Sequence, residues 1–535
     1  MPGKTKGPVM SKFRTLLLVT TMLPLAACGA DDIASPGEGV IIVPTPTPTP
    51  TPPTTPPTTP PGTPAASCVT GTIDRGVVAN RRVCELPGRF TADTTLQNVP
   101  GLAYQIAGPT NVGTDCGGDT AAPLAACQSV TLTVQPGVVV VAQSGNDYLV
   151  VNRGSRINAV GNATQPIIFT HRSNLEGTVT DTSQGLWGGI ILLGRAPISD
   201  CNSAVAGGSA NCQQVIEGTT GSLYGGASPN DNSGSLRFVQ IRYSGFEIAP
   251  GNELQGLTMG GVGQLTTVDH IHVHNSSDDG IEIFGGRVNT KYIAITGADD
   301  DGYDTDLGYR GTAQFLLAVQ KPTGDGDSAL EIDSNGNEDA LPRQYNRISN
   351  ATLIQRRNSS GGNGILLRGG TDFALLNSIV VSSQACLDID ATGGTTSRDA
   401  DAGLFDLGAP VFRSVVMNCG TPFRDDNNVA LALVTTIFGS GANNNNSAYT
   451  PSLINSFMNG ATENAVTVTD PTAFNADIYA GTGQPNAAAP NRLQAVSFIG
   501  AISGAGDTSF QGWTCNSGYA NFGGSGGSCT SLPAS

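Results

Sequence analysis

The strongest restriction on the fold comes from a long series of short apolar segments separated by tight turns. Segments of about four to seven residues, such as residues 130–134, 281–284 and 292–295, alternate with turns rich in Gly, Asn and Asp. The 70 glycines fit frequent turns, and no long stretch has the 3.6-residue periodicity of an amphipathic helix. The sequence therefore predicts an all-β protein.

The apolar segments recur at a loose interval of roughly 20 to 25 residues. Residues 267–276 and residues 289–297 illustrate one such interval, and each segment ends in a polar or glycine corner. A repeat of this kind predicts a solenoid, in which each coil buries an inward row of side chains and stacks on its neighbours. No WD-type or blade-length repeat is found, so the sequence favours a β-helix over a propeller.

Several segments also resemble known families. Residues 134–138, 149–159 and 166–170 resemble the opening coils of right-handed parallel β-helices of the pectin-lyase-like kind. A family of secreted bacterial β-helix lipoproteins, largely uncharacterised, is similar to the chain from about residue 130 to residue 514, most clearly at residues 186–198, 278–286 and 299–309. The resemblance implies a right-handed parallel β-helix and export, and it implies no particular reaction.

The N-terminus has the pattern of an export signal. Lys12 and Arg14 precede an apolar run over residues 16–25, and Ala26-Ala27-Cys28 follow. The run is about half the roughly 20 residues that span a bilayer. The segment resembles a bacterial lipobox, which implies cleavage before Cys28 and lipidation of its thiol. Gly29, rather than Asp, favours the outer membrane by the same analogy, and an ordinary signal cut nearby is the alternative.

The composition divides the chain into five parts. Residues 44–64 form an almost pure Thr-Pro tract, which predicts extended polyproline II geometry of about 3.1 Å per residue. Such a tether would hold the folded part away from the lipid. The predicted parts are a signal peptide (1–27), the lipidated cysteine and linker (28–66), a disulfide-containing N-terminal cap (67–128), the parallel β-helix (129–427), and C-terminal coils or a cap with a flexible tail (428–535).

Cysteine use agrees with export. Ten cysteines remain besides Cys28, an even number typical of an oxidising compartment. Taken in sequence order they form five local pairs, although the spacing alone leaves the connectivity open. No C-x-x-C spacing occurs, so a zinc ribbon or thioredoxin-like site is not favoured. The ten are Cys68, Cys84, Cys116, Cys127, Cys201, Cys212, Cys386, Cys419, Cys515 and Cys529.

The negative charge of the chain disfavours polyanionic partners. Its formal net charge is -16, and removal of residues 1–27 with their four basic residues makes it about -20. So acidic a chain repels nucleic acid and anionic lipid. The acidity instead suits cation binding or a soluble surface domain.

Two acidic clusters are candidate calcium sites. Adjacent β-helix coils lie about 4.8 Å apart, so carboxylates at matching positions could share one ion with ligands at roughly 2.3 to 2.6 Å. Solvated turns are the alternative. The first cluster comprises Asp278, Asp279, Asp299, Asp300, Asp301, Asp304 and Asp306, and the second includes Asp325, Asp327, Glu331 and Asp333.

Three of the four histidines are a further candidate metal site. His270, His272 and His274 alternate along one predicted strand, which would place them on one face. Neutral imidazoles at that spacing could bind a transition metal. A stripe of exposed histidines is the alternative.

The leading functional hypothesis is a non-catalytic binding or structural module displayed at the cell surface, with a glycan, an ion or an outer-membrane protein as partner. Its candidate sugar platforms are Tyr224, Tyr243, Tyr303, Tyr309 and Phe284.

A calcium-dependent polysaccharide lyase or a glycoside hydrolase is the alternative. A lyase would need a calcium-bound substrate and a base, for which Arg242, Arg310 and Arg368 are candidates. Residues 277–280 faintly resemble one element of polygalacturonases, whereas the Asn-Thr-Asp, Gly-His-Gly and Arg-Ile-Lys elements are absent. There is also no P-loop or dinucleotide fingerprint.

Overall fold

A computed structural model gives the structure of the protein. The model describes residues 62–535 except 250, 325, 335–337, 357–361, 391–395, 426–428, 477–488, 525 and 535. The signal, Cys28 and almost all of the Thr-Pro tract therefore lie outside the described residues. The chain forms two units, residues 1–58 and 59–535, and the described residues belong to the second. None of the helices among the described residues is long and apolar enough to cross a membrane.

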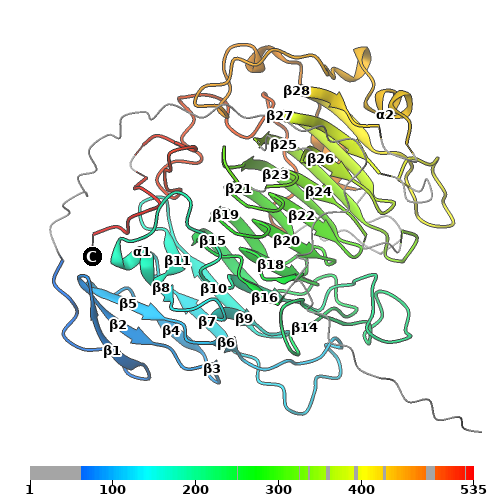
Figure 1. Cartoon of the computed structure of the whole chain (residues 1–535). Helices are drawn as coiled ribbons and strands as arrows, with labels where there is room; N and C mark the ends of the chain where they lie inside the picture. Colours follow the sequence, from blue (N-terminus) through cyan, green and yellow to red (C-terminus); the bar gives the residue numbers. More distant parts are fainter. Residues whose placement is uncertain are drawn as a thin grey trace, which may run out of the picture. The chain divides into compact units, whose positions relative to one another are not determined.

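Stacked parallel strands form the body of this unit, which confirms the predicted parallel β-helix (Figure 1). A first ladder of parallel pairs runs through the short strands β3 (Arg89–Phe90), β6 (Pro109–Val112), β9 (Tyr148–Val151), β12 (Ile190–Leu193), β18 (Leu257–Gly260), β20 (Ile281–Phe284), β22 (Tyr303–Asp306), β24 (Leu330–Ile332) and β26 (Asn363–Leu367).

The remaining faces are formed by two further ladders that merge. One consists of β4 (Thr94–Leu96), β7 (Thr131–Val134) and β10 (Arg156–Val160), and the other of β2 (Arg81–Glu85), β5 (Leu102–Gln105), β8 (Val139–Ala142) and β11 (Ile167–His171). Both continue into long strands, namely β15 (Gly234–Arg242), β19 (Thr267–His274), β21 (Asn289–Thr296), β23 (Arg310–Val319), β25 (Tyr345–Gln355), β27 (Asp372–Ile389) and β28 (Val411–Phe423).

Parallel pairing thus begins with β2, inside the segment expected to be an N-terminal cap, where only β1 (Ile73–Val78) pairs antiparallel. The remaining elements are two small hairpins and short helices: β13 (Gln214–Val215) with β14 (Leu223–Tyr224), β16 (Glu247–Ala249) with β17 (Asn252–Glu253), α1 (Arg172–Glu176), α2 (Leu431–Phe438), and the 3-10 helices η2 (Gly441–Asn443), η3 (Glu463–Ala465) and η4 (Pro471–Asn475).

The long strands turn a corner at one residue each. That residue has a left-handed backbone, with φ of 55° at Phe238, 55° at His270, 51° at Tyr292 and 59° at Phe315. The register places these four side chains in one row, and consecutive ring centroids lie 4.2, 4.6 and 4.7 Å apart. Since bulky residues rarely adopt this backbone, ring stacking offsets part of its cost.

This corner changes the expected arrangement of the histidines. His270 belongs to the aromatic row, whereas His272 and His274 lie beyond the bend, fully buried. The sequence predicted one straight strand, and the left-handed residue in its middle breaks the period-two pattern. The histidines therefore do not form an exposed stripe.

The core runs along the axis of the coils. Alternate side chains of each strand point inward, for example Ile281 and Ile283 of β20 and Ile293 and Ile295 of β21, and all four belong to one buried cluster. The register pairs Thr267 with Asn289, the same interval that the sequence repeat indicates.

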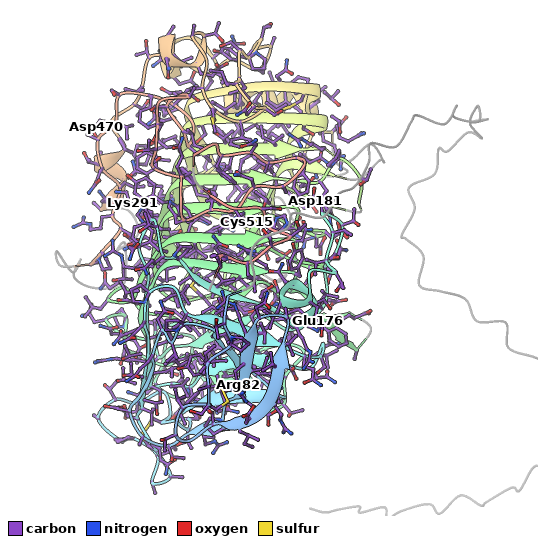
Figure 2. The ribbon with its side chains drawn as sticks, turned by 90° about the vertical axis from the view of Figure 1, so that its left-hand side faces the viewer. Arg82, Glu176, Asp181, Lys291, Asp470 and Cys515 are labelled. Carbon is purple, nitrogen blue, oxygen red and sulfur yellow. A yellow bond between two sulfur atoms is a disulfide. The ribbon has the colours of Figure 1, made fainter. Side chains whose placement is uncertain are left out.

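The C-terminal segment covers one end of the coils and then runs back along them. Val434 and Phe438 of α2 are buried, and Phe438 packs on Phe412 and Phe423 of β28. The segment that follows lies over the long strands, with Cys515 in front of them in Figure 2. Trp513 packs edge-on against His270.

Hydrogen bonds fix the end of this segment. Arg242 donates to the carbonyls of Cys529 and Ser531, at 2.8 and 2.9 Å. Arg81 of β2 donates to the Pro533 carbonyl at 2.8 Å. These residues are therefore bonded to the coils, and the flexible tail expected at residues 523–527 stays a prediction.

All five disulfides join cysteines that are neighbours in sequence order, which decides the connectivity that the spacing alone left open. They are Cys68–Cys84, Cys116–Cys127, Cys201–Cys212, Cys386–Cys419 and Cys515–Cys529.

His272 should make stability depend on pH. Its Nε2 lies 2.9 Å from Thr296 Oγ1, and its Nδ1 accepts from the Cys515 backbone N–H. Burial, and then Arg242, lower the pKa of His272 to about 3. Below about pH 6.5 the unfolded chain binds a proton that the folded chain does not, so this histidine costs stability as the pH falls.

We expect the parent protein to lose about 2 to 3 kcal/mol relative to His272→Gln between about pH 6.5 and pH 4.5. Urea unfolding of both proteins across this range measures the difference, in which other titrations cancel. A difference that does not change with pH would contradict the prediction.

Candidate metal centre on an acidic face

Acidic residues recur at matching positions of the first ladder. The register aligns Ile281, Tyr303 and Leu330, which point inward. One residue later it aligns Glu282, Asp304 and Glu331, which point outward because side chains alternate along a strand.

Further carboxylates precede the strands or end them. Together these residues are called the acidic face, which comprises Asp278, Asp279, Glu282, Asp300, Asp301, Asp304, Asp306, Asp327, Glu331 and Asp333.

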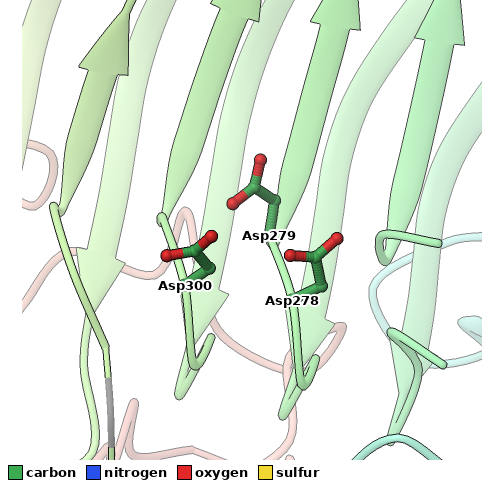
Figure 3. Close-up of side chains that lie close together, drawn as sticks. All are labelled: Asp278, Asp279 and Asp300. Carbon is green, nitrogen blue, oxygen red and sulfur yellow. The ribbon is translucent and has the colours of Figure 1, made fainter. Parts of the chain in front are cut away.

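The carboxylates converge in three groups. Asp278, Asp279 and Asp300 form the first, in which one oxygen of each lies within 4.8 Å of the others. Figure 3 shows them at the starts of two neighbouring strands. Asp279, Glu282 and Asp304 form the second group, and Asp300, Asp301 and Asp327 the third. Among the described residues, no group of this kind contains a histidine.

Backbone hydrogen bonds orient the inner carboxylates. Asp279 Oδ1 accepts from the Asp301 N–H at 2.8 Å, and Asp301 Oδ1 accepts from the Ser328 N–H at 2.6 Å. Each aspartate thereby links its own coil to the next. Gln255 Nε2 donates to Glu217 at 2.6 Å and to Asp278 at 3.2 Å, which joins the first ladder to the inserted segment.

Burial and mutual repulsion disfavour the ionised forms. Burial, and then the Asp300 carboxylate, raise the pKa of Asp278 to about 8. Burial, and then Asp333, raise the pKa of Asp306 to about 8. Burial is also the first cause that raises the pKa values of Asp279, Glu282 and Asp304 well above their usual range, and neighbouring carboxylates add to it.

Two carboxylates of the second group each have an oxygen that accepts no hydrogen bond. Glu282 is only 7% exposed, and its Oε2 has no hydrogen-bond partner. Asp304 Oδ1, in the same group, also has none. An unsatisfied buried oxygen is costly, and a hard divalent cation with oxygen ligands would relieve both this cost and the repulsion. Asp279, Glu282 and Asp304 therefore fit a calcium ion.

One arginine borders the acidic face. Arg368 Nη2 lies 2.5 Å from Glu331, and its Nε lies 2.9 Å from Asp333. Although burial lowers the pKa of Arg368, Glu331 and Asp333 raise it above its ordinary value. This arginine is accordingly held in its charged form.

One of the candidate calcium ligands lies elsewhere, and another is not described. The Asp299 carboxylate pairs with Lys321 Nζ at 2.8 Å and also accepts from Gln184, and it is in none of the three groups. Asp325 lies outside the described residues. The other nine candidates belong to the acidic face.

Sequence reasoning missed Glu282, Glu217 and Glu253. Glu282 could have been found by aligning residues 281–284 with residues 303–306. Glu217 lies between β13 and β14 and Glu253 ends β17, both outside the repeat. Burial raises the pKa of each, and neighbouring carboxylates add to the shift. No sequence pattern connects them to the site.

The other sequence candidates are mostly inaccessible. Arg242 and Arg310 are buried, with donor groups bonded to backbone carbonyls, so only Arg368 lies beside the acidic face. The five candidate sugar platforms, Tyr224, Tyr243, Tyr303, Tyr309 and Phe284, are all buried. Burial in the core or at the corners therefore explains these aromatic residues.

Comparison with protein families agrees with this architecture. The model of the pectate-lyase-like β-helix domain matches residues 119–456, more than half of the chain. The chain belongs to this family. Comparison with curated proteins and comparison with solved structures found no match. Membership of the pectate-lyase-like family establishes the β-helix and leaves the reaction and ligand to be argued from the site.

Removal of one charge from the acidic face should stabilise the metal-free protein. In chelator, Glu282→Gln should raise the free energy of unfolding by about 1 to 3 kcal/mol, because it removes a buried, repelled charge. Urea unfolding at neutral pH measures this change. Asp399→Asn, at an exposed carboxylate outside the acidic face, is the control and should change stability little. Destabilisation by Glu282→Gln in chelator would contradict the repulsion described here.

Proposed function

We propose that the protein is a calcium-loaded binding module for anionic polysaccharide, tethered to a bacterial outer membrane through lipidated Cys28. The observation that carries the proposal is the convergence of the Asp279, Glu282 and Asp304 carboxylates, in which one oxygen of Glu282 and one of Asp304 accept no hydrogen bond. The bound cation would offset the repulsion among these carboxylates and would take the carboxylate of a sugar acid as a further ligand, since calcium accepts more oxygen ligands than three carboxylates need supply. Right-handed winding of the coils is part of the same expectation.

Calcium binding should depend on this group of three. Calorimetric titration of the chelator-treated mature domain should show near-stoichiometric binding of calcium, with weaker binding of magnesium because the smaller ion demands stricter octahedral geometry. Glu282→Gln and Asp279→Asn should each weaken calcium at least about tenfold, the effect of losing one charged ligand. Asp399→Asn should bind as the parent does. Unchanged affinity in both ligand variants would refute the site.

Polysaccharide binding should follow the metal. Polygalacturonate should be retained in calcium and released in chelator, whereas a neutral glucan of similar length should bind in neither condition. Retention that is insensitive to chelator would separate glycan binding from the acidic face.

A lyase is the second candidate, favoured by the position of Arg368 beside the acidic face. Its ion pairs with Glu331 and Asp333 oppose a role as proton acceptor, since they hold the side chain charged. Appearance of unsaturated uronate ends during incubation with polygalacturonate, lost in Arg368→Gln, would favour the lyase over the binding module.

The membrane anchor is proposed from the sequence. Lys12, Arg14 and the apolar run before Cys28 support it. Cys28→Ser should abolish metabolic lipid labelling and release the protein from the membrane fraction. Gly29→Asp should keep the label but shift the protein towards the inner membrane. Continued membrane association of an unlabelled Cys28→Ser variant would contradict the anchor.

A further inference from the structure

A lysine, a glutamine and an aspartate form a closed ring of contacts outside the acidic face. Lys321 Nζ lies 2.8 Å from Asp299 Oδ1. The other oxygen of Asp299 accepts from Gln184 Nε2, and Gln184 Oε1 accepts from Lys321 Nζ. One carboxylate therefore contacts both nitrogens, while the amine also contacts the carboxamide oxygen.

Three separate segments supply these side chains. Lys321 follows β23, Asp299 lies between β21 and β22, and Gln184 lies between α1 and β12. Lys321 and Gln184 are 137 residues apart in the sequence. The backbone beside the glutamine is fixed on an intervening coil, because the Gly185 N–H donates to the Ser244 carbonyl at 2.8 Å. The ring of contacts is thus held by the fold rather than by one loop.

The lysine and the aspartate are largely shielded from water. The side chain of Lys321 is 5% exposed and that of Asp299 is 13% exposed. A Cβ atom at Gly324 would lie 2.6 Å from Asp299 Oδ1, and one at Gly297 would lie 2.9 Å from Lys321 Cγ. These distances are too short for a carbon atom, so main chain that only glycine permits encloses the pair. Such enclosure protects a reacting amide from hydrolysis.

Lysine is rare in this protein. Lys291 and Lys321 are the only lysines that follow Cys28 in the sequence. Lys291 lies elsewhere, with its Nζ 5.6 Å from the centroid of the Phe315 ring. Any reaction at Lys321 can therefore be measured against one internal reference lysine.

We propose that Lys321 and Gln184 form an isopeptide cross-link, with Asp299 as its catalytic carboxylate. The carbonyl carbon that the amine would attack lies one bond, about 1.2 Å, behind the oxygen that Lys321 already contacts. Holding both reactants in contact makes the reaction effectively unimolecular. The link would tie the segment before β12 to the end of β23 by a bond that reducing agents do not break.

The reaction needs no cofactor and no oxidant. Asp299 Oδ1 takes one proton from the Lys321 ammonium, and the freed electron pair attacks the Gln184 carbonyl carbon. Asp299 then gives that proton to Gln184 Nε2 as the Cδ–Nε2 bond breaks, which is general acid–base catalysis by one group. The second proton released by Nζ leaves with the ammonia as ammonium. The Cδ–Nζ bond thereby replaces the Cδ–Nε2 bond.

The experiment is peptide mapping of the purified protein by mass spectrometry after reduction, alkylation and trypsin digestion. Gln184 lies in the tryptic peptide 173–195 and Lys321 in the peptide 311–343, since trypsin does not cut before Pro322. We expect one linked pair of these peptides, whose mass is the sum of both less one ammonia.

Variants identify the role of each group. Lys321→Arg, Gln184→Glu and Asp299→Asn should each give the two peptides separately, because the nucleophile, the leaving ammonia or the proton carrier is missing. Lys291→Arg is the matched control and should keep the linked pair.

A second measurement does not depend on the folding of any variant. After denaturation and reduction, an amine-reactive reagent should modify Lys291 of the parent protein and leave Lys321 unmodified. On a denaturing gel the reduced parent should migrate ahead of Lys321→Arg, because a loop of 137 residues stays closed in the unfolded chain.

Either of two results would overturn the proposal. Recovery of peptides 173–195 and 311–343 from the parent only as separate peptides would show that the three side chains form an ion pair and hydrogen bonds without reacting. A linked pair that persists in Asp299→Asn would remove the carboxylate from the reaction. Neither result depends on calcium or polysaccharide, so this proposal and the proposed function fail separately.

Discussion

The parallel hydrogen-bond ladder is the constraint on which the rest of the structure depends. It holds successive coils about 4.8 Å apart, so equivalent residues of neighbouring coils become neighbours in space. Apolar rows such as Ile281 with Tyr303 gain from this arrangement, and so does the stacked row of Phe238, His270, Tyr292 and Phe315. The same rule brings Glu282 against Asp304, where like charges repel.

The acidic face combines residues of the regular ladder with residues of the turns beside it. Glu282 and Asp304 lie within β20 and β22, whereas Asp278 and Asp300 precede these strands. The strands fix the first pair, and the turns lie outside the core. A β-helix can thus vary its ligands at the corners without disturbing the core, which is consistent with a family whose shared feature is the fold.

The sequence predicted the features that depend on local periodicity. Short strands, the interval between residues 267 and 289, the disulfide pairs and most of the acidic cluster follow from patterns within one or two coils. Features set by distant segments were not predictable. The left-handed residue at His270 has no glycine to mark it, and the burial of His272 depends on the C-terminal segment, which contributes the Cys515 N–H.

The course of the C-terminal segment changes how such a stack can come apart. In an open solenoid each repeat contacts only its neighbours, and the terminal repeats fray first. Here the chain returns from the end covered by α2 to the first coil, where Arg81 holds the Pro533 carbonyl. Contacts at Arg242 and Trp513 lie along the way. The return segment contacts coils along the length of the stack. Separation of the first coil therefore also requires release of this segment, which is bonded to the other coils.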